Sequence, residues 1–240
     1  MTKTPYVAGA ALLQAAALTA CDAPRDDIPA TNVINPAPSP IASSGVPVSG
    51  PKRTVLALGD SLYAGYGLQR GEDLPNAIQT RLRGQGIDAT VINAGVSGDT
   101  TAGGRRRLAF TLDRMQSPPD LVLLGLGGND VLRQVDPAET RANMAAMLDE
   151  LGRRGIPVIL TGMMAPPNLG PDFAARFNAI WPDLAREHQA VLDPFILEGV
   201  IGDRQLMLPD GVHPNARGVE RMADRVAPLV SKRLAALPDQ

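Results

Sequence analysis

The stretch Thr54-Val55-Leu56-Ala57-Leu58 is followed directly by Gly59-Asp60-Ser61-Leu62. An apolar run that ends in glycine and small polar residues predicts a buried strand that delivers its last residues to a turn. Open α/β sheets hold their ligand crevices at the carboxyl ends of such strands. Ser61 is therefore a candidate nucleophile, although the same four residues also suit an ordinary turn or the N-cap of a helix.

Four further short apolar runs follow, separated by stretches of helix length. Asp73-Leu74-Pro75 and Asp136-Pro137-Ala138-Glu139 open two of these stretches with helix-start signals, and Asn215 to Leu237 carries one apolar stripe. Strands that alternate with helices predict βαβ units. We expect one α/β domain with three layers (α/β/α) and a five-stranded parallel sheet of flavodoxin-like layout. Its strands are predicted at Val55–Leu58, Ala89–Asn93, Leu121–Leu126, Val158–Thr161 and Val191–Leu192.

The composition limits the classes of partner. The chain has 240 residues, 44% of them hydrophobic but only 3% aromatic, so the core must be mostly aliphatic. Its net charge is −2, from 23 basic and 25 acidic residues, and it lacks the basic excess of a nucleic-acid-binding face. We expect no nucleic-acid partner and a monomer. The one basic run, Arg105-Arg106-Arg107, is expected on the solvated face of a helix.

The N-terminus has the pattern of an export signal. A short positive start, Met1-Thr2-Lys3, precedes an apolar stretch from Tyr6 to Leu18 that is too short to span a bilayer. Leu18-Thr19-Ala20-Cys21 resembles a bacterial lipobox, and Cys21 is the only cysteine of the chain. Residues 1–20 are predicted to be a lipoprotein signal peptide, so that the protein is exported, periplasmic and anchored to a membrane by lipid on Cys21. Ordinary secretory cleavage is the alternative.

A polar segment separates this signal from the predicted domain. Residues 21–51 are rich in Pro, Ala and Ser and show no hydrophobic period. Such a segment buries too little apolar surface to offset the conformational entropy that it would lose on ordering, so we expect a disordered tether. The catalytic domain is then predicted to span residues 52–240.

A serine nucleophile needs a base, and the chain has two histidines. His188 stands near the end of a predicted helix, where a histidine commonly faces solvent. His213 follows Asp210 by three residues in a glycine-containing turn, which allows the carboxylate to reach the imidazole Nδ1–H and fix its tautomer. His213 is the better candidate base, with Asp210 as its orienting acid.

Two loops after predicted strands offer donors for an oxyanion. Asn93 to Thr100 contains Gly98, whose backbone N–H a reacting carbonyl can approach closely. Gly127-Gly128-Asn129-Asp130 contributes the side-chain amide of Asn129. Read alone, each loop also has the composition of a plain turn.

Four motifs occur in a fixed order: Gly59-Asp60-Ser61-Leu62, Ser97-Gly98-Asp99-Thr100, Gly127-Gly128-Asn129-Asp130 and Asp210-Gly211-Val212-His213-Pro214. Together they resemble the motif blocks of the SGNH (GDSL) hydrolases, and the longer stretches resemble the periplasmic acyl-thioesterase/lysophospholipase and bacterial arylesterase branch. The resemblance covers roughly residues 53 to 235. It implies strand order 2-1-3-4-5 and no metal or cofactor. It also implies a nucleophile, an oxyanion hole and a triad made by Ser61, Gly98, Asn129, Asp210 and His213.

The resemblance implies a serine esterase or thioesterase that hydrolyses aryl esters, acyl thioesters or lysophospholipids through an acyl-enzyme on Ser61. Residues 165–170 match in position a loop that borders the acyl site in this branch, so Asn168 and Leu169 are candidate substrate-binding residues. Three alternatives remain: a deacetylase of cell-envelope polysaccharide, a non-catalytic lipoprotein binding module and a flavodoxin-like nucleotide binder. The last would need a phosphate-cradling loop after the first strand, and Gly59-Asp60-Ser61-Leu62 is a poor one.

Overall fold

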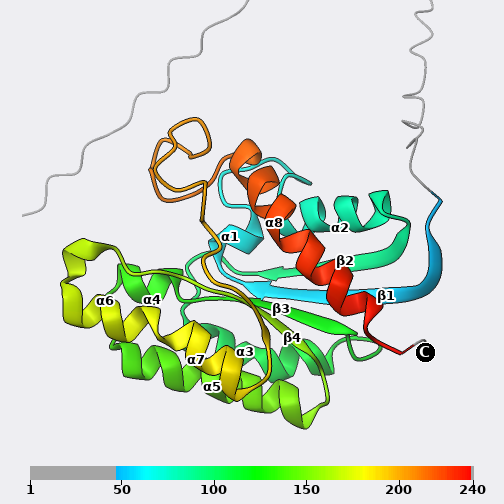
Figure 1. The fold of residues 1–240 in the computed structure, drawn as a ribbon, viewed down its shortest axis with the longest axis horizontal. Coiled ribbons are helices and arrows are strands. Elements are labelled where there is room, and N and C mark those ends of the chain that lie inside the picture. The colour runs from blue at the N-terminus through cyan, green and yellow to red at the C-terminus, as the bar shows by residue number, and fades with distance from the viewer. Residues whose placement is uncertain (1–46, 239–240) are drawn as a thin grey trace, which may run out of the picture. The chain divides into compact units, whose positions relative to one another are not determined.

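The computed structural model describes residues 47–238, which form a parallel sheet between two layers of helices (Figure 1). The predicted signal peptide, Cys21 and most of the predicted tether lie outside the described residues. The elements, in chain order, are β1 Ser49–Gly59, α1 Ser61–Ala64, α2 Leu74–Gly84, β2 Ile87–Gly95, α3 Thr101–Asp113, β3 Leu121–Gly125, α4 Gly128–Leu132, α5 Pro137–Arg153, β4 Val158–Thr161, the 3₁₀ turn η1 Pro167–Leu169, α6 Pro171–Asn178, α7 Ile180–Glu187, β5 Val191–Asp193 and α8 Ala216–Ala235.

The sheet has the order β2-β1-β3-β4-β5, and every neighbouring pair is parallel. Both the predicted fold class and the implied strand order are confirmed. In β1, Val55 pairs with Val91 on one side and with Leu121 on the other. The apolar run of β1 is fully buried because helices cover both faces of the sheet, as expected for a parallel sheet.

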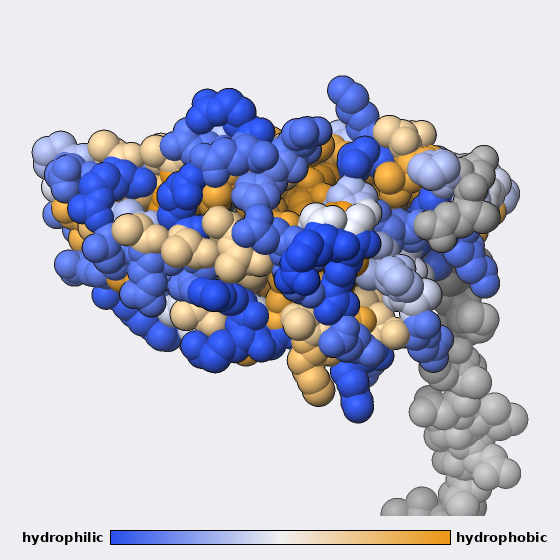
Figure 2. Space-filling model, turned by 90° about the horizontal axis from the view of Figure 1, so that it is seen from below, coloured by the Kyte–Doolittle hydropathy of each residue, from blue (hydrophilic) through white to orange (hydrophobic). Residues whose placement is uncertain are grey.

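Helices α2 and α8 pack together on one face of the sheet, and α3, α5 and α7 form the layer on the other (Figure 1). Viewed from below, this second layer exposes mostly hydrophilic residues with small apolar patches between them (Figure 2). No helix within residues 47–238 combines the length and hydropathy that a membrane span requires.

The helix starts read from the sequence are confirmed by their caps. The Asp73 carboxylate accepts a hydrogen bond from the Asn76 N–H at 3.1 Å, and that of Asp136 accepts one from the Ala138 N–H at 2.9 Å. Each bond satisfies one of the backbone donors that a helix N-terminus leaves unpaired. The connections between strands are therefore fixed locally.

Strand β1 begins earlier than the sequence predicted. Ser49 pairs with Ile87, and its N–H donates to the Gly86 carbonyl at 2.8 Å. Residues 49–51, which the composition assigned to the tether, thus belong to the sheet. Hydropathy missed them because this pairing uses backbone groups and leaves the side chains exposed or half-buried.

Candidate active site

Ser61, His213 and Asp210 form one hydrogen-bonded chain at the carboxyl end of β1. The Ser61 Oγ lies 3.0 Å from Nε2 of His213, and Nδ1 of His213 lies 2.7 Å from Oδ2 of Asp210. Ser61 is the first residue of α1 and is 9% exposed, whereas Asp210 and His213 lie in the turn before α8. The fold thus brings together the nucleophile and base candidates that the sequence separates by 152 positions.

The turn around Asp210 holds its carboxylate ready for the imidazole. Its Oδ1 accepts the backbone N–H groups of Val212 at 2.9 Å and His213 at 3.0 Å, which leaves Oδ2 for the His213 ring. The His213 backbone N–H, followed by the His213 side chain, lowers the pKa of Asp210 to about 2. Asp210 is therefore ionised across the physiological range and can orient the imidazole and stabilise its protonated form.

The backbone around Ser61 is tightly packed. A Cβ on Gly59 would lie 2.4 Å from Cγ of Tyr63, so only glycine allows Tyr63 to cross the strand end at this point. The Tyr63 hydroxyl lies 2.9 Å from the Thr161 hydroxyl at the end of β4. These contacts fix the start of α1, and with it Ser61, against the sheet.

Asp60 caps α1 from a buried position. Its Oδ1 accepts the Leu62 N–H at 3.0 Å, and the residue is only 2% exposed. Burial, which disfavours the charged form, raises the pKa of Asp60 to about 6. The sequence singled out Asp60 only as part of a motif and gave no sign of this shift.

The predicted oxyanion donors lie in two neighbouring loops. Gly98 has φ +82° in the loop between β2 and α3, and Asn129 lies in the first turn of α4. The Asn129 amide donates one hydrogen bond to the Asp99 carbonyl at 2.9 Å, and its second N–H has no partner among the described residues. The backbone N–H groups of Ser61 and Gly98 also lack a partner within residues 47–238. Of the three residues, Ser61 and Asn129 line the cavity described below, whereas Gly98 does not.

Arg107 links the loops that carry these donors. Its guanidinium donates to the Asp99 carboxylate at 2.6 Å, to the Ala94 carbonyl at 2.7 Å and to the Gly59 carbonyl at 2.9 Å. Arg105 and Arg106 are exposed, as expected, but the expectation of a solvated face is wrong for Arg107. Hydropathy treats all three arginines alike and cannot show that one of them reaches back to two strand ends.

Asp130 fixes α4 to the start of α3. It is 1% exposed and accepts hydrogen bonds from the Thr101 N–H at 2.8 Å and the Thr101 hydroxyl at 2.5 Å. The Thr140 hydroxyl adds a third at 3.3 Å. The sequence marks Asp130 only as a member of a motif that also has the composition of a turn, since its structural role depends on partners that are distant in the chain.

The His213 ring also contacts an aromatic residue that the sequence did not single out. The ring centroids of Tyr66 and His213 lie 4.3 Å apart at an interplanar angle of 32°. Tyr66 is 51% exposed, so about half of the residue remains open to solvent. No spacing rule would have connected it to His213, since the contact depends on the fold.

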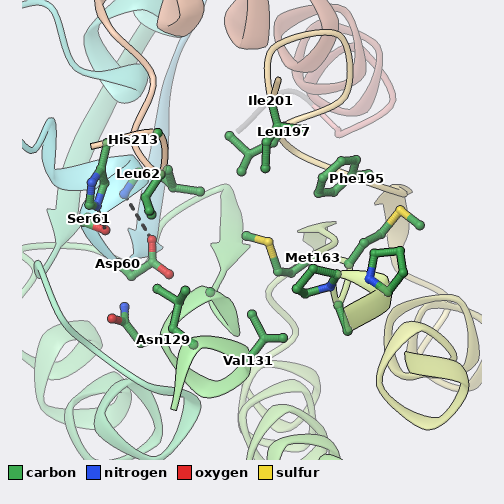
Figure 3. A pocket seen from close by; sticks show the side chains of 18 residues that line it. Asp60, Ser61, Leu62, Asn129, Val131, Met163, Phe195, Leu197, Ile201 and His213 are labelled. Carbon is green, nitrogen blue, oxygen red and sulfur yellow. Dashed lines mark hydrogen bonds between the residues drawn. The ribbon is translucent and has the colours of Figure 1, made fainter. Parts of the chain in front are cut away.

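A cavity of about 400 Å³ opens beside Ser61. Figure 3 shows Ser61 and His213 on one side of it, with Val131, Met163, Phe195 and Ile201 facing them from other elements. The predicted candidates Asn168 and Leu169 are not among its lining residues, and the same loop contributes its preceding residues instead. The lining consists of Asp60, Ser61, Leu62, Gly128, Asn129, Val131, Leu132, Met163, Met164, Ala165, Pro166, Pro167, Phe195, Leu197, Ile201, Gly211, Val212 and His213.

The lining is almost wholly apolar. Its ionisable side chains are the buried Asp60 and the base candidate His213. Within the described part of the chain, no three His, Cys, Asp or Glu side chains gather as metal ligands would. The arrangement offers a nucleophile, a base and hydrogen-bond donors at one end of an apolar chamber.

Comparisons with known proteins show which family the chain belongs to. The arylesterase of Vibrio mimicus is 39% identical over 75% of this chain and 89% of its own length. Thioesterase 1/protease 1/lysophospholipase L1 of Escherichia coli (strain K12) is 35% identical over 74% of this chain and 85% of its own. The crystal structure of AlinE4, an SGNH-hydrolase family esterase, matches with a TM-score of 0.66 and 50% identity, covering 79% of this chain and 99% of that one. The model of the GDSL-like lipase/acylhydrolase family matches residues 57–221, so the chain belongs to that family.

Proposed function

We propose that the protein is a serine hydrolase of carboxylic esters and thioesters that acts through an acyl-enzyme on Ser61. The observation that carries this proposal is the hydrogen-bonded chain Ser61–His213–Asp210 at the mouth of an apolar cavity. The names of the relatives, which include an arylesterase and a thioesterase/lysophospholipase, support the same bond types.

In the proposed mechanism, His213 accepts the Ser61 hydroxyl proton as Oγ attacks the acyl carbon. The carbonyl oxygen becomes an oxyanion, which receives hydrogen bonds from the N–H groups of Ser61 and Gly98 and from the Asn129 amide. His213 then gives its proton to the leaving alcohol or thiol. In the second half, His213 takes a proton from water as the water oxygen attacks the acyl carbon. The bond from that carbon to Ser61 Oγ then breaks, His213 returns the proton to Oγ, and the acid leaves.

The apolar lining of the cavity supports a substrate in which an acyl chain is attached to the reacting carbonyl carbon. Its lining is aliphatic, thioether and aromatic, and it includes Met163, Phe195 and Leu197 (Figure 3). A polysaccharide would leave its hydroxyls unpaired against this wall, at a cost for each buried polar group. Deacetylation of a glycan is therefore not favoured. We place the control of acyl-chain length on residues 163–167 and Phe195.

The proposal extends to the location of the protein. We assign residues 1–20 to a lipoprotein signal peptide, Cys21 to a lipid anchor in the periplasm and residues 22–48 to a tether before a monomeric domain. The lipobox pattern and the single cysteine support this assignment. The mass of the mature N-terminus tests it, because an unmodified Cys21, or a cut at another position, contradicts it.

The activity is tested by hydrolysis of three substrate series: aryl esters, acyl-coenzyme A thioesters and lysophospholipids, each of graded chain length. We expect turnover that passes through an optimum at a medium or long chain, and a shift of that optimum to longer chains in Phe195→Ala. An acetylated glycan serves as the competing substrate. Turnover of the glycan but not of the acyl series would contradict the proposed substrate class.

A further inference from the structure

Five large apolar side chains that stay exposed gather around the mouth of the cavity. Their exposed fractions range from 38% for Val212 to 61% for Leu132. Four of them line the cavity, and the fifth, Tyr66, packs against His213. Single exposed apolar residues are ordinary, whereas a contiguous group marks an interaction surface. We call this group the apolar rim: Tyr66, Leu132, Met164, Ile201 and Val212.

The rim is assembled from several parts of the chain. Tyr66 follows α1, Leu132 ends α4, and Met164 follows β4, while Ile201 and Val212 lie between β5 and α8. No exposed charged side chain belongs to the cavity lining. The wall of the cavity is therefore apolar up to its opening, and about half of each rim residue stays in water unless a partner covers it.

Among the partners that could cover the apolar rim, a lipid surface fits the structure best. The cavity that we assign to the acyl chain opens within the rim, so a surface that covers the rim presents acyl chains directly to Ser61. The chain ahead of the sheet also has the needed reach, since the 27 residues between Cys21 and Ser49 can span up to about 95 Å when extended. A tyrosine, which is apolar with one polar end, suits a membrane–water interface.

We infer that the apolar rim docks onto the bilayer that holds the Cys21 anchor, so that acyl chains enter the cavity without crossing water. This inference rests on the anchor and the acyl site proposed above. Docking buries the half-exposed apolar rim. Because the lipid anchor and the tether keep the domain near the membrane, its effective concentration at the surface is high, which favours docking.

The test uses the lipidated full-length protein with one added cysteine. Because the lipid occupies the thiol of Cys21, the only native cysteine, an introduced cysteine is the only free thiol. Leu132→Cys and Ile201→Cys place an environment-sensitive nitrobenzoxadiazole dye on the rim. Phe110→Cys is the matched control, because Phe110 is an exposed apolar residue, at 66%, on α3 and outside the cavity lining. Each protein is reconstituted into phosphatidylcholine vesicles with and without nitroxide-labelled lipid.

We expect the emission of both rim dyes to shift to shorter wavelength and to fall more than about twofold with nitroxide lipid, while the Phe110→Cys dye changes little. If the rim dyes respond no more than the control dye, the docking proposal is wrong. The rim would then have a protein as its partner. A protein mass without lipid overturns the anchor and the docking together. Neither result depends on hydrolysis, so failure of the proposed activity is detected separately.

Discussion

Arg107 and Asp99 form an ion pair of 2.6 Å beside the loop that holds Gly98. The same guanidinium binds the carbonyl of Gly59, two residues before Ser61, and the Asp99 carbonyl accepts the Asn129 amide. Arg107 therefore connects the segments that carry Ser61 and Gly98 directly, and Asn129 is joined to them through Asp99. Its hydrogen bonds are charge-assisted, which makes them stronger than bonds between neutral groups.

Arg107→Ala is expected to destabilise the protein by about 2–4 kcal/mol, because it leaves the partly buried Asp99 carboxylate without its charged partner and removes a donor from the Ala94 and Gly59 carbonyls. We also expect kcat to fall by about tenfold or more while KM changes little, since the oxyanion donors lose their alignment. Urea unfolding and steady-state kinetics measure the two effects. Arg106→Ala is the control, because Arg106 is exposed on the same helix. Equal effects of the two substitutions would refute the linking role of Arg107.

Asn129→Ala removes a donor that the mechanism assigns to the oxyanion. We expect kcat to fall on the order of 10²–10³-fold with a small change in KM, since the donor acts mainly in the transition state. Kinetics on a soluble aryl ester measure this. Since the substitution also removes the hydrogen bond to the Asp99 carbonyl, a thermal melt must show that the fold is retained. A folded variant with unchanged kcat would exclude Asn129 from the oxyanion hole.

Asp210→Asn keeps the shape of the side chain but replaces the acceptor for His213 Nδ1 with an uncharged amide. The wild-type carboxylate stays ionised, because hydrogen bonds from His213 and Val212 lower its pKa to about 2. We expect a loss of kcat on the order of 10³–10⁴-fold near neutral pH, since the imidazole loses its orientation and the charge that stabilises its protonated form. Retention of more than about a tenth of the wild-type kcat contradicts this role for Asp210.

Asp60 predicts a pH dependence of stability. Burial raises its pKa from 3.8 to about 6, so between these values the folded state binds more protons than the unfolded state. The free energy of unfolding therefore falls as the pH rises through this window. Above the window, the whole cost of ionising the buried Asp60 carboxyl lowers the stability of the folded state. We therefore compare the free energies of unfolding of Asp60→Asn and wild type at two pH values. From about pH 4 to about pH 7.5, we expect this difference to shift in favour of Asp60→Asn by on the order of 1–3 kcal/mol.

Urea unfolding at the two pH values measures this gain. Asp172→Asn is the control, because the Asp172 side chain is 89% exposed and makes only a long contact to Arg176 at 3.7 Å. If the free-energy difference between Asp60→Asn and wild type is the same at both pH values, Asp60 is not the titrating group.

The local sequence predicted most of the fold because the sheet is buried on both faces. Strands such as Leu121–Gly125 are continuous apolar runs, and caps such as Asp73 are local signals, so neither needs knowledge of the tertiary structure. The start of β1 at Ser49 was missed because that pairing depends on Ile87 and leaves no hydropathy pattern.

Some residues of the candidate site could likewise be predicted from the local sequence, and others could not. Ser61, Asn129 and His213 stand directly after strands or before the last helix, where motif and position can be read along the chain. The roles of Arg107 and Tyr66 depend on distant partners, and the cavity wall combines segments from the start of α1 to the turn before α8. Side-chain reach and tertiary packing decide these roles, and a single sequence contains no local signal for them.

Covalent labelling with an alkyl fluorophosphonate tests the central claim most directly, because the probe reacts with a serine that a nearby base activates. The full-length protein is treated, digested and mapped by mass spectrometry, beside a folded Ser61→Ala control. The account predicts one adduct, on the peptide that contains Ser61, and none in Ser61→Ala. No adduct on the folded wild type, or an adduct that persists in Ser61→Ala, would contradict it.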